Sequence, residues 1–254
     1  NKIKARNLQS VGTIGKLYYG KEGEIKFTPD GDLKQIIKYP HRKDDNTTGG
    51  IVIYQAPHKT SEGTVPRNMY VICHDPYGQN QSADSTSLGA AYVIKRPNNI
   101  SQPDDMIVAS YVGRPATQDE YNRNLFMLAD YYGCKIGFEN DRGEVIAYAK
   151  RHRKLHRLQE EFEMLDKKDL RSKTVKRQYG MHMTDENGNQ TLNLHKIYDP
   201  ALLLELIKFN HKGNFDRVMA FMIGMYHTRE LYNTEIKEIL EDNSSNKWFD
   251  QNYY

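Results

Sequence analysis

Three acidic residues stand at distant positions in the chain, each where a strand or helix is expected to present it. Asp75 ends the run YVICHD, Glu139 ends KIGFE, and Asp216 opens the helical pattern DRVMAFMIGM. Carboxylate oxygens that converge from separate elements suit hard divalent cations. Each acid also has an ordinary explanation, because Asp is common in turns after strands and acids favour the first turn of a helix.

The runs around these acids predict the elements that would position them. Three apolar runs rich in β-branched and aromatic residues predict consecutive strands in an antiparallel meander, and spacing typical of a helix that ends at Gly133 follows them. These four segments are 69–75, 87–96, 106–113 and 118–132. The run 134–140 predicts a fourth strand, which ends at Glu139.

The second half of the chain predicts more helix than strand. Residues 143–165 have helical spacing, and 178–184 predict a fifth strand. Asp199 and Pro200 resemble the N-cap and first residue of a helix, and the last strong helix spans Phe215 to Arg229. Its apolar stripe is formed by Met219, Ile223 and Tyr226. The order predicts an α/β fold with a mixed sheet of five or more strands flanked by helices.

The predicted fold would bring the three acids close enough to act together. If the first and fourth predicted strands are neighbours, Asp75 and Glu139 lie side by side at the rim of the sheet, and Asp216 arrives on the adjacent helix. Three unneutralised carboxylates repel one another, so the cluster makes physical sense when cations occupy it. Two divalent ions there, Mg²⁺ or Mn²⁺, could activate water and stabilise the leaving oxygen of a phosphodiester.

Composition limits the class of protein. The chain has 254 residues, 38% of them hydrophobic, which is sufficient for one substantial core. The longest apolar stretch is far shorter than a membrane span, and no signal-peptide pattern follows the basic start, so neither membrane insertion nor secretion is expected. Cys73 and Cys134 fall in predicted strands and are expected to be buried, reduced thiols, as in a cytosolic protein.

Positive charge is concentrated in one window. Between Arg142 and Arg177 there are 12 Lys and Arg against 6 Asp and Glu, an excess of six, whereas the net charge of the whole chain is +3. Such a window either contacts the phosphates of a nucleic acid or is the solvated face of a helix, and the sequence leaves both open. The candidates for phosphate contact are Lys150, Arg151, Arg153 and Lys154.

Taken together, four segments resemble the successive motifs of the nuclease domain of phage terminase large subunits. They are YVICHDPYGQNQSADSTSLGAAYVI, KIGFENDRGEVIAYAK, YGMHMT followed by NLHK, and HKGNFDRVMAFMIGM. The resemblance covers roughly residues 50 to 230 and implies a ribonuclease H-like fold. It implies a metal-dependent endonuclease that cuts concatemeric viral DNA with low sequence specificity in the host cell cytoplasm.

The resemblance also implies residue roles and partners. Asp75 matches the metal ligand of the first strand, Glu139 the acid after the fourth strand, and Asp216 the acid on the last helix. Asp84 is a weaker candidate for a further ligand or a supporting residue. The implied partners are double-stranded DNA, the portal protein, the small terminase subunit and an ATPase domain of the same full-length chain.

Departures from the family pattern shape the domain prediction. No GxxxxGK[ST] phosphate loop occurs, so no ATP hydrolysis is expected from these residues, and His211 is the nearest histidine before Asp216. We predict a linker with lead-in strands at 1–66, a nuclease domain at 67–235 and a flexible tail at 236–254. The alternatives are a non-catalytic module that clamps DNA or docks on the portal, and another ribonuclease H-like nuclease of resolvase or integrase type.

Overall fold

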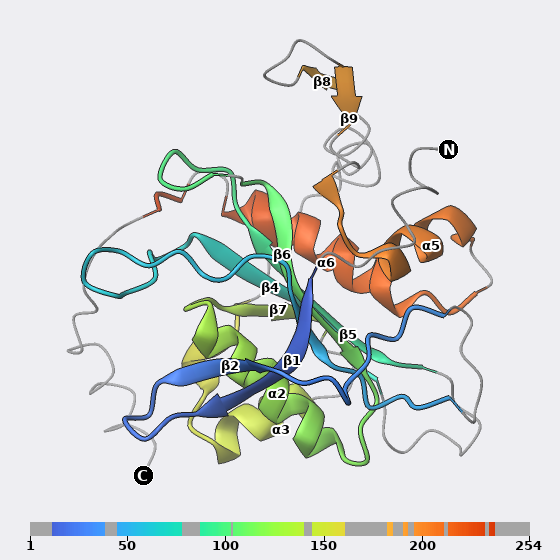
Figure 1. The fold of residues 1–254 in the computed structure, drawn as a ribbon, viewed down its shortest axis with the longest axis horizontal. Coiled ribbons are helices and arrows are strands. Elements are labelled where there is room, and N and C mark those ends of the chain that lie inside the picture. Colours follow the sequence, from blue (N-terminus) through green and yellow to red (C-terminus); the bar gives the residue numbers. More distant parts are fainter. Residues whose placement is uncertain are drawn as a thin grey trace.

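The structure is a computed structural model, and one seven-stranded mixed sheet organises it, with helices on both faces (Figure 1). The strands lie in the order β2-β1-β3-β6-β5-β4-β7. The structure describes residues 12–38, 45–77, 87–102, 104–139, 144–160, 182–184, 190–192, 196–210, 213–231 and 234–236. The predicted α/β class, a mixed sheet flanked by helices, is confirmed.

The bounds of the elements are as follows. The strands of the main sheet are β1 (Thr13–Tyr19), β2 (Ile25–Pro29), β3 (Ile51–Ile53), β4 (Tyr70–Asp75), β5 (Gly89–Lys95), β6 (Met106–Gly113) and β7 (Ile136–Phe138). The helices are α2 (Gln118–Tyr131), α3 (Glu144–Arg151), the 3-10 turn η1 (Leu155–Arg157), α5 (Pro200–Lys208) and α6 (Asp216–Glu230). A separate two-stranded ribbon is formed by β8 (His182–Thr184) and β9 (Gln190–Leu192).

The predicted meander and its parallel neighbour are confirmed. Strands β4, β5 and β6 pair antiparallel in succession, and Asp75 pairs with Ala90 of β5. After α2 the chain returns as β7, which pairs parallel to β4 with His74 opposite Phe138. The carboxyl ends of β4 and β7 therefore lie at one edge of the sheet.

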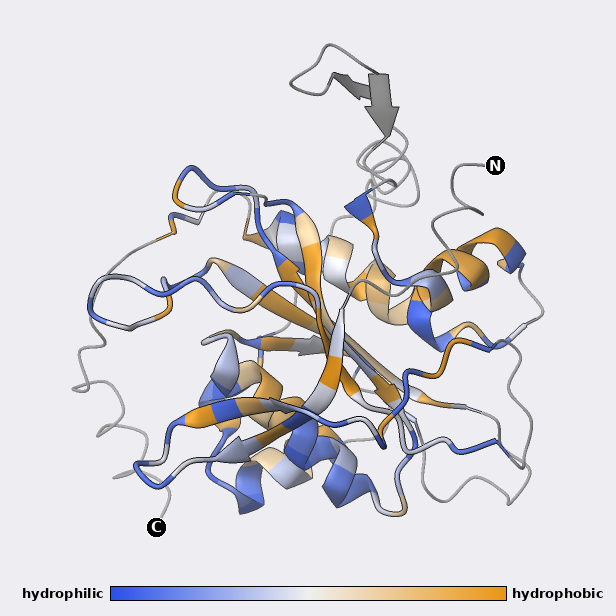
Figure 2. Cartoon of the chain, in the orientation of Figure 1, coloured by the Kyte–Doolittle hydropathy of each residue, from blue (hydrophilic) through white to orange (hydrophobic). Residues whose placement is uncertain are grey.

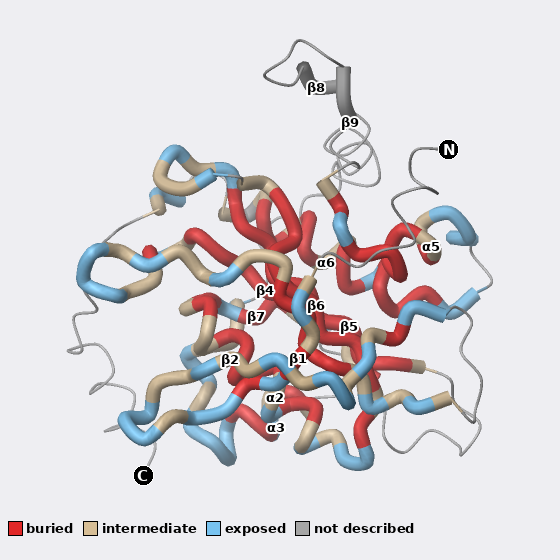
Figure 3. Tube along the Cα trace, viewed as in Figure 1, coloured by how far each residue is buried: buried red, intermediate tan, exposed pale blue. Residues whose placement is uncertain are grey.

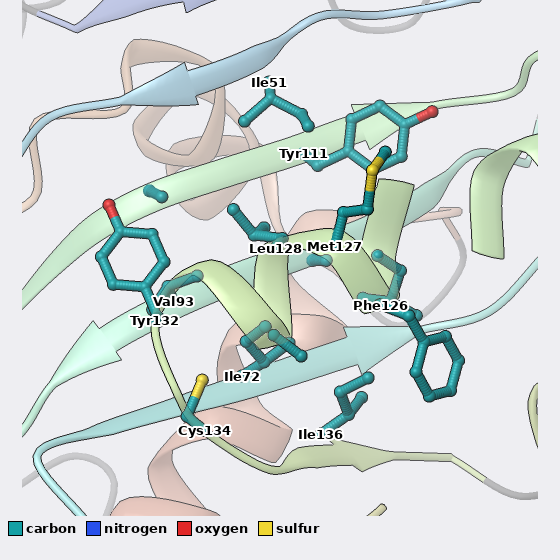
Figure 4. Close-up of a cluster of buried hydrophobic side chains, with 14 of the residues drawn as sticks. Ile51, Ile72, Val93, Tyr111, Phe126, Met127, Leu128, Tyr132, Cys134 and Ile136 are labelled. Carbon is teal, nitrogen blue, oxygen red and sulfur yellow. The ribbon is translucent and has the colours of Figure 1, made fainter. Parts of the chain in front are cut away.

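Two buried apolar layers cover the two faces of the sheet (Figure 3). Helices α2 and α3 pack on one face, where Leu128 of α2 lies with Ile72 of β4 and Ile136 of β7 (Figure 4). Helices α5 and α6 cover the other face, against Val71 and Cys73 of β4. Hydrophobic residues accordingly run along the central strands (Figure 2). The alternation along β4 thus directs odd-numbered residues towards α6 and even-numbered residues towards α2.

The three amino-terminal strands extend this same sheet. Strand β3 pairs with β6, β1 pairs with β3, and β2 forms the outer edge. The expected lead-in strands are therefore part of the main sheet and pack on the face of α2. The proposed division of the chain at residue 66 stays a prediction, and most of the predicted tail, from residue 237 onwards, lies outside the described residues.

Local chemistry explains where the helices begin and end. Asp199 caps α5, as predicted, by accepting hydrogen bonds from the N–H groups of Ala201 and Leu202. Thr117, which the sequence analysis did not single out, caps α2 by accepting from the Glu120 N–H. Gly133 has φ of 59° and ends α2, which confirms the predicted glycine cap. Within the described residues, no helix is long and apolar enough to cross a bilayer.

Three sequence predictions need correction. The helix expected over 143–165 ends at Arg151, because Arg153 takes a left-handed φ of 55° and Leu158 then bridges to Ile136. Of the expected fifth strand, the described part is β8, which pairs with β9 in the separate ribbon and not with the main sheet, while 178–181 lie outside the described residues. Cys134 is buried and free as expected but precedes β7 instead of lying within it, while Cys73 lies in β4.

The apolar stripe predicted for α6, formed by Met219, Ile223 and Tyr226, is not the buried side of this helix. Met219 is 38% exposed, and Ile223 and Tyr226 are only half-buried. The helix instead buries the side that carries Val218, Phe221 and Met225. Residues 218–226 in the middle of the helix form a continuous apolar run, so periodicity alone could not select the buried side.

Candidate active site

The three predicted acids lie at the same edge of the sheet. Asp75 is the last residue of β4 and is nearly buried, and it points towards the α6 face, as does its partner Ala90. Glu139 directly follows β7 and is exposed, and its N–H donates to the His74 carbonyl at 3.4 Å. Since Phe138 packs on the α2 side, the alternation directs Glu139 to the α6 face beside Asp75.

Asp216 reaches this edge from the first residue of α6. Its Oδ2 accepts a hydrogen bond from the Leu88 N–H at 2.9 Å, and its Oδ1 accepts one from the Ser87 hydroxyl at 3.0 Å. Asn214 donates a third at 3.3 Å. Ser87 and Leu88 directly precede β5, whose Ala90 pairs with Asp75, so this carboxylate is fixed against the strand end next to Asp75.

The electrostatics of the edge link two of the acids, Asp75 and Asp216, to one neighbouring group. Burial raises the pKa of Asp216, and the hydrogen bonds from Leu88 and Ser87 oppose that rise. Burial also raises the pKa of Tyr121, and the charges of Asp75 and Asp216 raise it further. Tyr121 stands beneath the strand ends, with its ring against Gly89, so both carboxylates act on one hydroxyl.

Neighbouring polar groups brace the edge on the α2 side. The Gln118 side-chain amide donates to the Tyr77 carbonyl at 3.0 Å and to Glu144 Oε2. Glu144 begins α3 and is half-buried. These contacts tie the starts of α2 and α3 to the segment that follows Asp75.

His74 lies on the opposite face from Asp75. Its Nδ1 is 3.1 Å from the Ala90 carbonyl, its ring stacks on Tyr121, and burial lowers its pKa to about 4. It is a neutral, packed histidine on the α2 side of the sheet. His211, Asp141 and Asp84 lie outside the described residues, so the possible ligand role of Asp84 stays a prediction.

The carboxylates have the chemistry that hard cations need, but the side chains do not form a closed ligand set. Among the described residues, no three His, Cys, Asp or Glu side chains are grouped so that they could hold a metal ion. Asp216 already accepts three hydrogen bonds, and a carboxylate offers about four acceptor sites. Metal binding at this edge therefore requires Asp75 and the exposed Glu139 to turn towards Asp216.

The four cations proposed for phosphate contact lie at the end of α3 and just beyond it. Arg151 pairs with Asp119 at 2.6 Å, and Lys154 pairs with Asp130 at 2.6 Å. Asp130 lies in the last turn of α2, about 18 Å along the helix from Gln118 at 1.5 Å per residue. Lys154 is thus remote from the edge that carries Asp75, and DNA contact by Lys150, Arg151, Arg153 and Lys154 stays a prediction.

Sequence reasoning missed Ser87, Arg114 and Gln118, which line the same edge. The predicted antiparallel meander could have identified Ser87 and Arg114. When three consecutive strands pair antiparallel, the end of the first, the start of the second and the end of the third share one edge. Ser87 lies just before β5 and Arg114 follows β6, so both belong there.

Comparisons with known proteins find distant structural matches. No protein-family model and no curated protein matches the sequence. Among solved structures, the crystal structure of the large terminase nuclease from thermophilic phage G20c with bound zinc matches with 15% identity and a TM-score of 0.43. That match covers 76% of this chain and 92% of the other. A likeness of this size does not assign a function.

Proposed function

We propose that this chain is a metal-dependent endonuclease that hydrolyses phosphodiester bonds of double-stranded DNA, the nuclease domain of a phage terminase large subunit. The observation that supports the proposal is that three elements bring Asp75, Glu139 and Asp216, from distant parts of the sequence, to one edge of the sheet, where small rotations of their side chains would let them share an ion. Carboxylates that turn towards one another would repel unless cations neutralise them.

Each acid has a role in this proposal. Asp75, between the other two, would be shared by two Mg²⁺ or Mn²⁺ ions, and Glu139 and Asp216 would each complete the ligands of one. Ions held there supply water activation and stabilise the leaving oxygen of the phosphodiester. Asp216 is held in place by Ser87 and Leu88, whereas the exposed Glu139 can adjust its position.

The substrate and partners follow from the motif resemblance. DNA would be held through its phosphates and cut with little preference for sequence, because nothing in the chain resembles a set of residues that reads bases. In the host cell cytoplasm the domain would act with an ATPase domain of its full-length chain, the portal protein and the small terminase subunit.

The test is cleavage of supercoiled plasmid in Mn²⁺, Mg²⁺ or EDTA, with the wild type beside Asp75→Asn. We expect nicking and linearisation by the wild type with either ion, none with EDTA, and loss of cutting in the variant with an unchanged melting temperature. Intact plasmid in every lane would instead favour a module that clamps DNA or docks on a partner. Cutting of branched but not plain duplex would favour a resolvase.

A further inference from the structure

A glycine stands at the start of β5, between the residue that donates to Asp216 and the residue that pairs with Asp75. Gly89 lies between Leu88, whose N–H donates to Asp216 Oδ2, and Ala90, the strand partner of Asp75. The φ of Gly89 lies outside the left-handed region, so its backbone conformation does not require glycine. The reason for a glycine here lies in what packs against it.

The ring of Tyr121 occupies the space that a side chain at residue 89 would need. A Cβ there would lie 2.5 Å from Tyr121 Cζ and 2.6 Å from its Cε2, far closer than carbon atoms approach in a packed interior. Tyr121 is the fourth residue of α2 and is 1% exposed. Because Gly89 has no side chain, this aromatic ring packs directly against the backbone of β5.

Neighbouring rings hold Tyr121 in that position. Tyr111 of β6 stacks on it with ring centres 4.7 Å apart, and His74 of β4 stacks on it at 5.3 Å. The Tyr77 ring meets it edge-on at 5.4 Å, and the Tyr121 hydroxyl lies 3.4 Å from His74 Nδ1. His74 and Tyr77 flank Asp75 in the sequence, so one ring packs against the chain on both sides of Asp75.

We propose that Tyr121 is a positioning residue, whose ring sets the end of β4 and the start of β5 at the separation at which Asp75 and Asp216 can share a divalent ion. This inference rests on the proposed function and adds a residue that acts through the backbone. Metal ligands must be held within about 0.5 Å of the productive geometry by packed neighbours. A ring that three other rings hold in place is a support of that kind. The rival explanation is that Tyr121 only fills the core.

The experiment is calorimetric titration of Mn²⁺ into the full chain and its variants, with thermal unfolding of each. Tyr121→Leu removes the ring, Tyr121→Phe keeps it, and Tyr132→Leu is the matched control. Tyr132 is a buried tyrosine of the same apolar layer (Figure 4), and its ring packs edge-on against Tyr70. Tyr70 begins β4, about 17 Å along the strand from Asp75 at about 3.4 Å per residue.

We expect Tyr121→Leu to weaken Mn²⁺ binding about tenfold, the lower end of the range for residues that support metal ligands. Tyr121→Phe should bind the ion as the wild type does, because the ring remains. Tyr132→Leu should lower the melting temperature as Tyr121→Leu does, since both lose a buried ring, but it should leave Mn²⁺ binding unchanged.

A second pair of variants tests the contact between the ring and the strand. Gly89→Ala places a methyl group where the ring lies, and it should weaken Mn²⁺ binding because the ring and the strand must move apart. In the double variant Gly89→Ala with Tyr121→Leu, the two losses of affinity should not multiply, because both changes remove the same contact.

Mn²⁺ binding by Tyr121→Leu as tight as that of the wild type would overturn the inference and leave Tyr121 as a core residue. Equal weakening in Tyr132→Leu or in Tyr121→Phe, or losses that multiply in the double variant, would overturn it as well.

The wild type separates these results from the proposed function. If the wild type binds Mn²⁺ and cuts plasmid while Tyr121→Leu binds the ion normally, only the inference falls. If the wild type binds the ion without cutting and Tyr121→Leu binds it weakly, the positioning role stands without the nuclease. A wild type that binds no Mn²⁺ overturns both.

Discussion

Asp216 has two tasks at the residue scale. It is a candidate metal ligand, and it is also the acceptor that satisfies the buried Leu88 N–H at the start of β5. Backbone and hydroxyl donors fix the position of this carboxylate. The same contacts mean that a variant of Asp216 tests the fold and the site together, so loss of activity in such a variant alone is ambiguous.

Replacing Asp216 by Ala should therefore destabilise the fold by about 1–3 kcal/mol, because a buried N–H loses its partner. Urea denaturation followed by circular dichroism measures this change. Ser87→Ala is the matched control, since it removes one donor but leaves the Leu88 hydrogen bond, and we expect a smaller effect. A variant at 216 as stable as the wild type would contradict the structural role.

His227 predicts how stability depends on pH. Burial lowers its pKa from 6.5 to about 4, so the folded state holds the neutral imidazole against the Ile72 carbonyl. Between these values the unfolded chain binds more protons, so stability is present above pH 6.5 and is lost as pH falls towards 4. The slope from this group is at most about 1.4 kcal/mol per pH unit.

The check is urea denaturation at several pH values for the wild type and His227→Gln. Carboxyl groups titrate in both proteins, so the difference between the two curves isolates the histidine. We expect the variant to lose less stability than the wild type as the pH is lowered. Parallel curves would show that His227 does not titrate as the structure predicts.

At the scale of elements, α6 is the part that brings Asp216 to the sheet. It lies close to β4 because Gly224 faces the strand, and a Cβ there would come within 2.6 Å of both Cys73 Sγ and Ile94 Cδ1. Such a clash must move the helix or the strand, since protein interiors are close-packed. The position of the candidate site thus depends on a residue far from it along α6.

Gly224→Ala should destabilise the protein by about 1–3 kcal/mol through overpacking, although alanine is the better helix former by about 1 kcal/mol. Thermal unfolding shows whether the variant is less or more stable than the wild type. We also expect reduced plasmid cutting, because α6 moves with Asp216. A raised melting temperature would mean that the helix accommodates the methyl group and that close contact with β4 is not needed.

A buried ion pair joins α5 to α6. Glu205 and Arg217 are 1% and 2% exposed, and Glu205 accepts from both the Arg217 guanidinium and its N–H. Arg217 also donates to the Ile36 carbonyl in the segment between β2 and β3. The pair therefore holds the residue next to Asp216 against two other parts of the chain.

Glu205→Ala should cost about 3–5 kcal/mol, because it leaves a buried guanidinium without its carboxylate. The double variant Glu205→Leu with Arg217→Met removes both charges and should regain much of that loss. Chemical denaturation of the two variants makes the comparison. Equal stability of the single variant and the wild type would contradict the importance of the pair.

Element prediction from the sequence succeeded where patterns were strong. The apolar runs predicted β4, β5 and β6, and the capping residues Gly133 and Asp199 marked helix ends by local chemistry. Prediction failed where tertiary contacts determine where a helix ends or which of its sides is buried. The end of α3 depends on the bridge from Leu158 back to β7, and the buried side of α6 depends on β4, so neither is visible in local spacing.

At the scale of the molecule, the candidate site exists because the sheet aligns the ends of elements from opposite halves of the chain. The sequence predicted Asp75 and Glu139 as neighbours from one assumption, that the first and fourth predicted strands pair, and the parallel pairing of β4 with β7 meets it. The contacts of Arg114 at this edge could not be predicted in the same way, because they join it to Tyr77 and Ser87, which are distant in the sequence.

The most direct test of the central claim is calorimetric titration of Mn²⁺ into the wild type, Asp75→Asn and Glu139→Gln. These two residues come from different strands, and neither replaces the carboxylate that supports Leu88. If the acids form one site, the wild type binds the ion and each variant binds it much more weakly. Binding in both variants as strong as in the wild type would contradict a shared metal site at this edge.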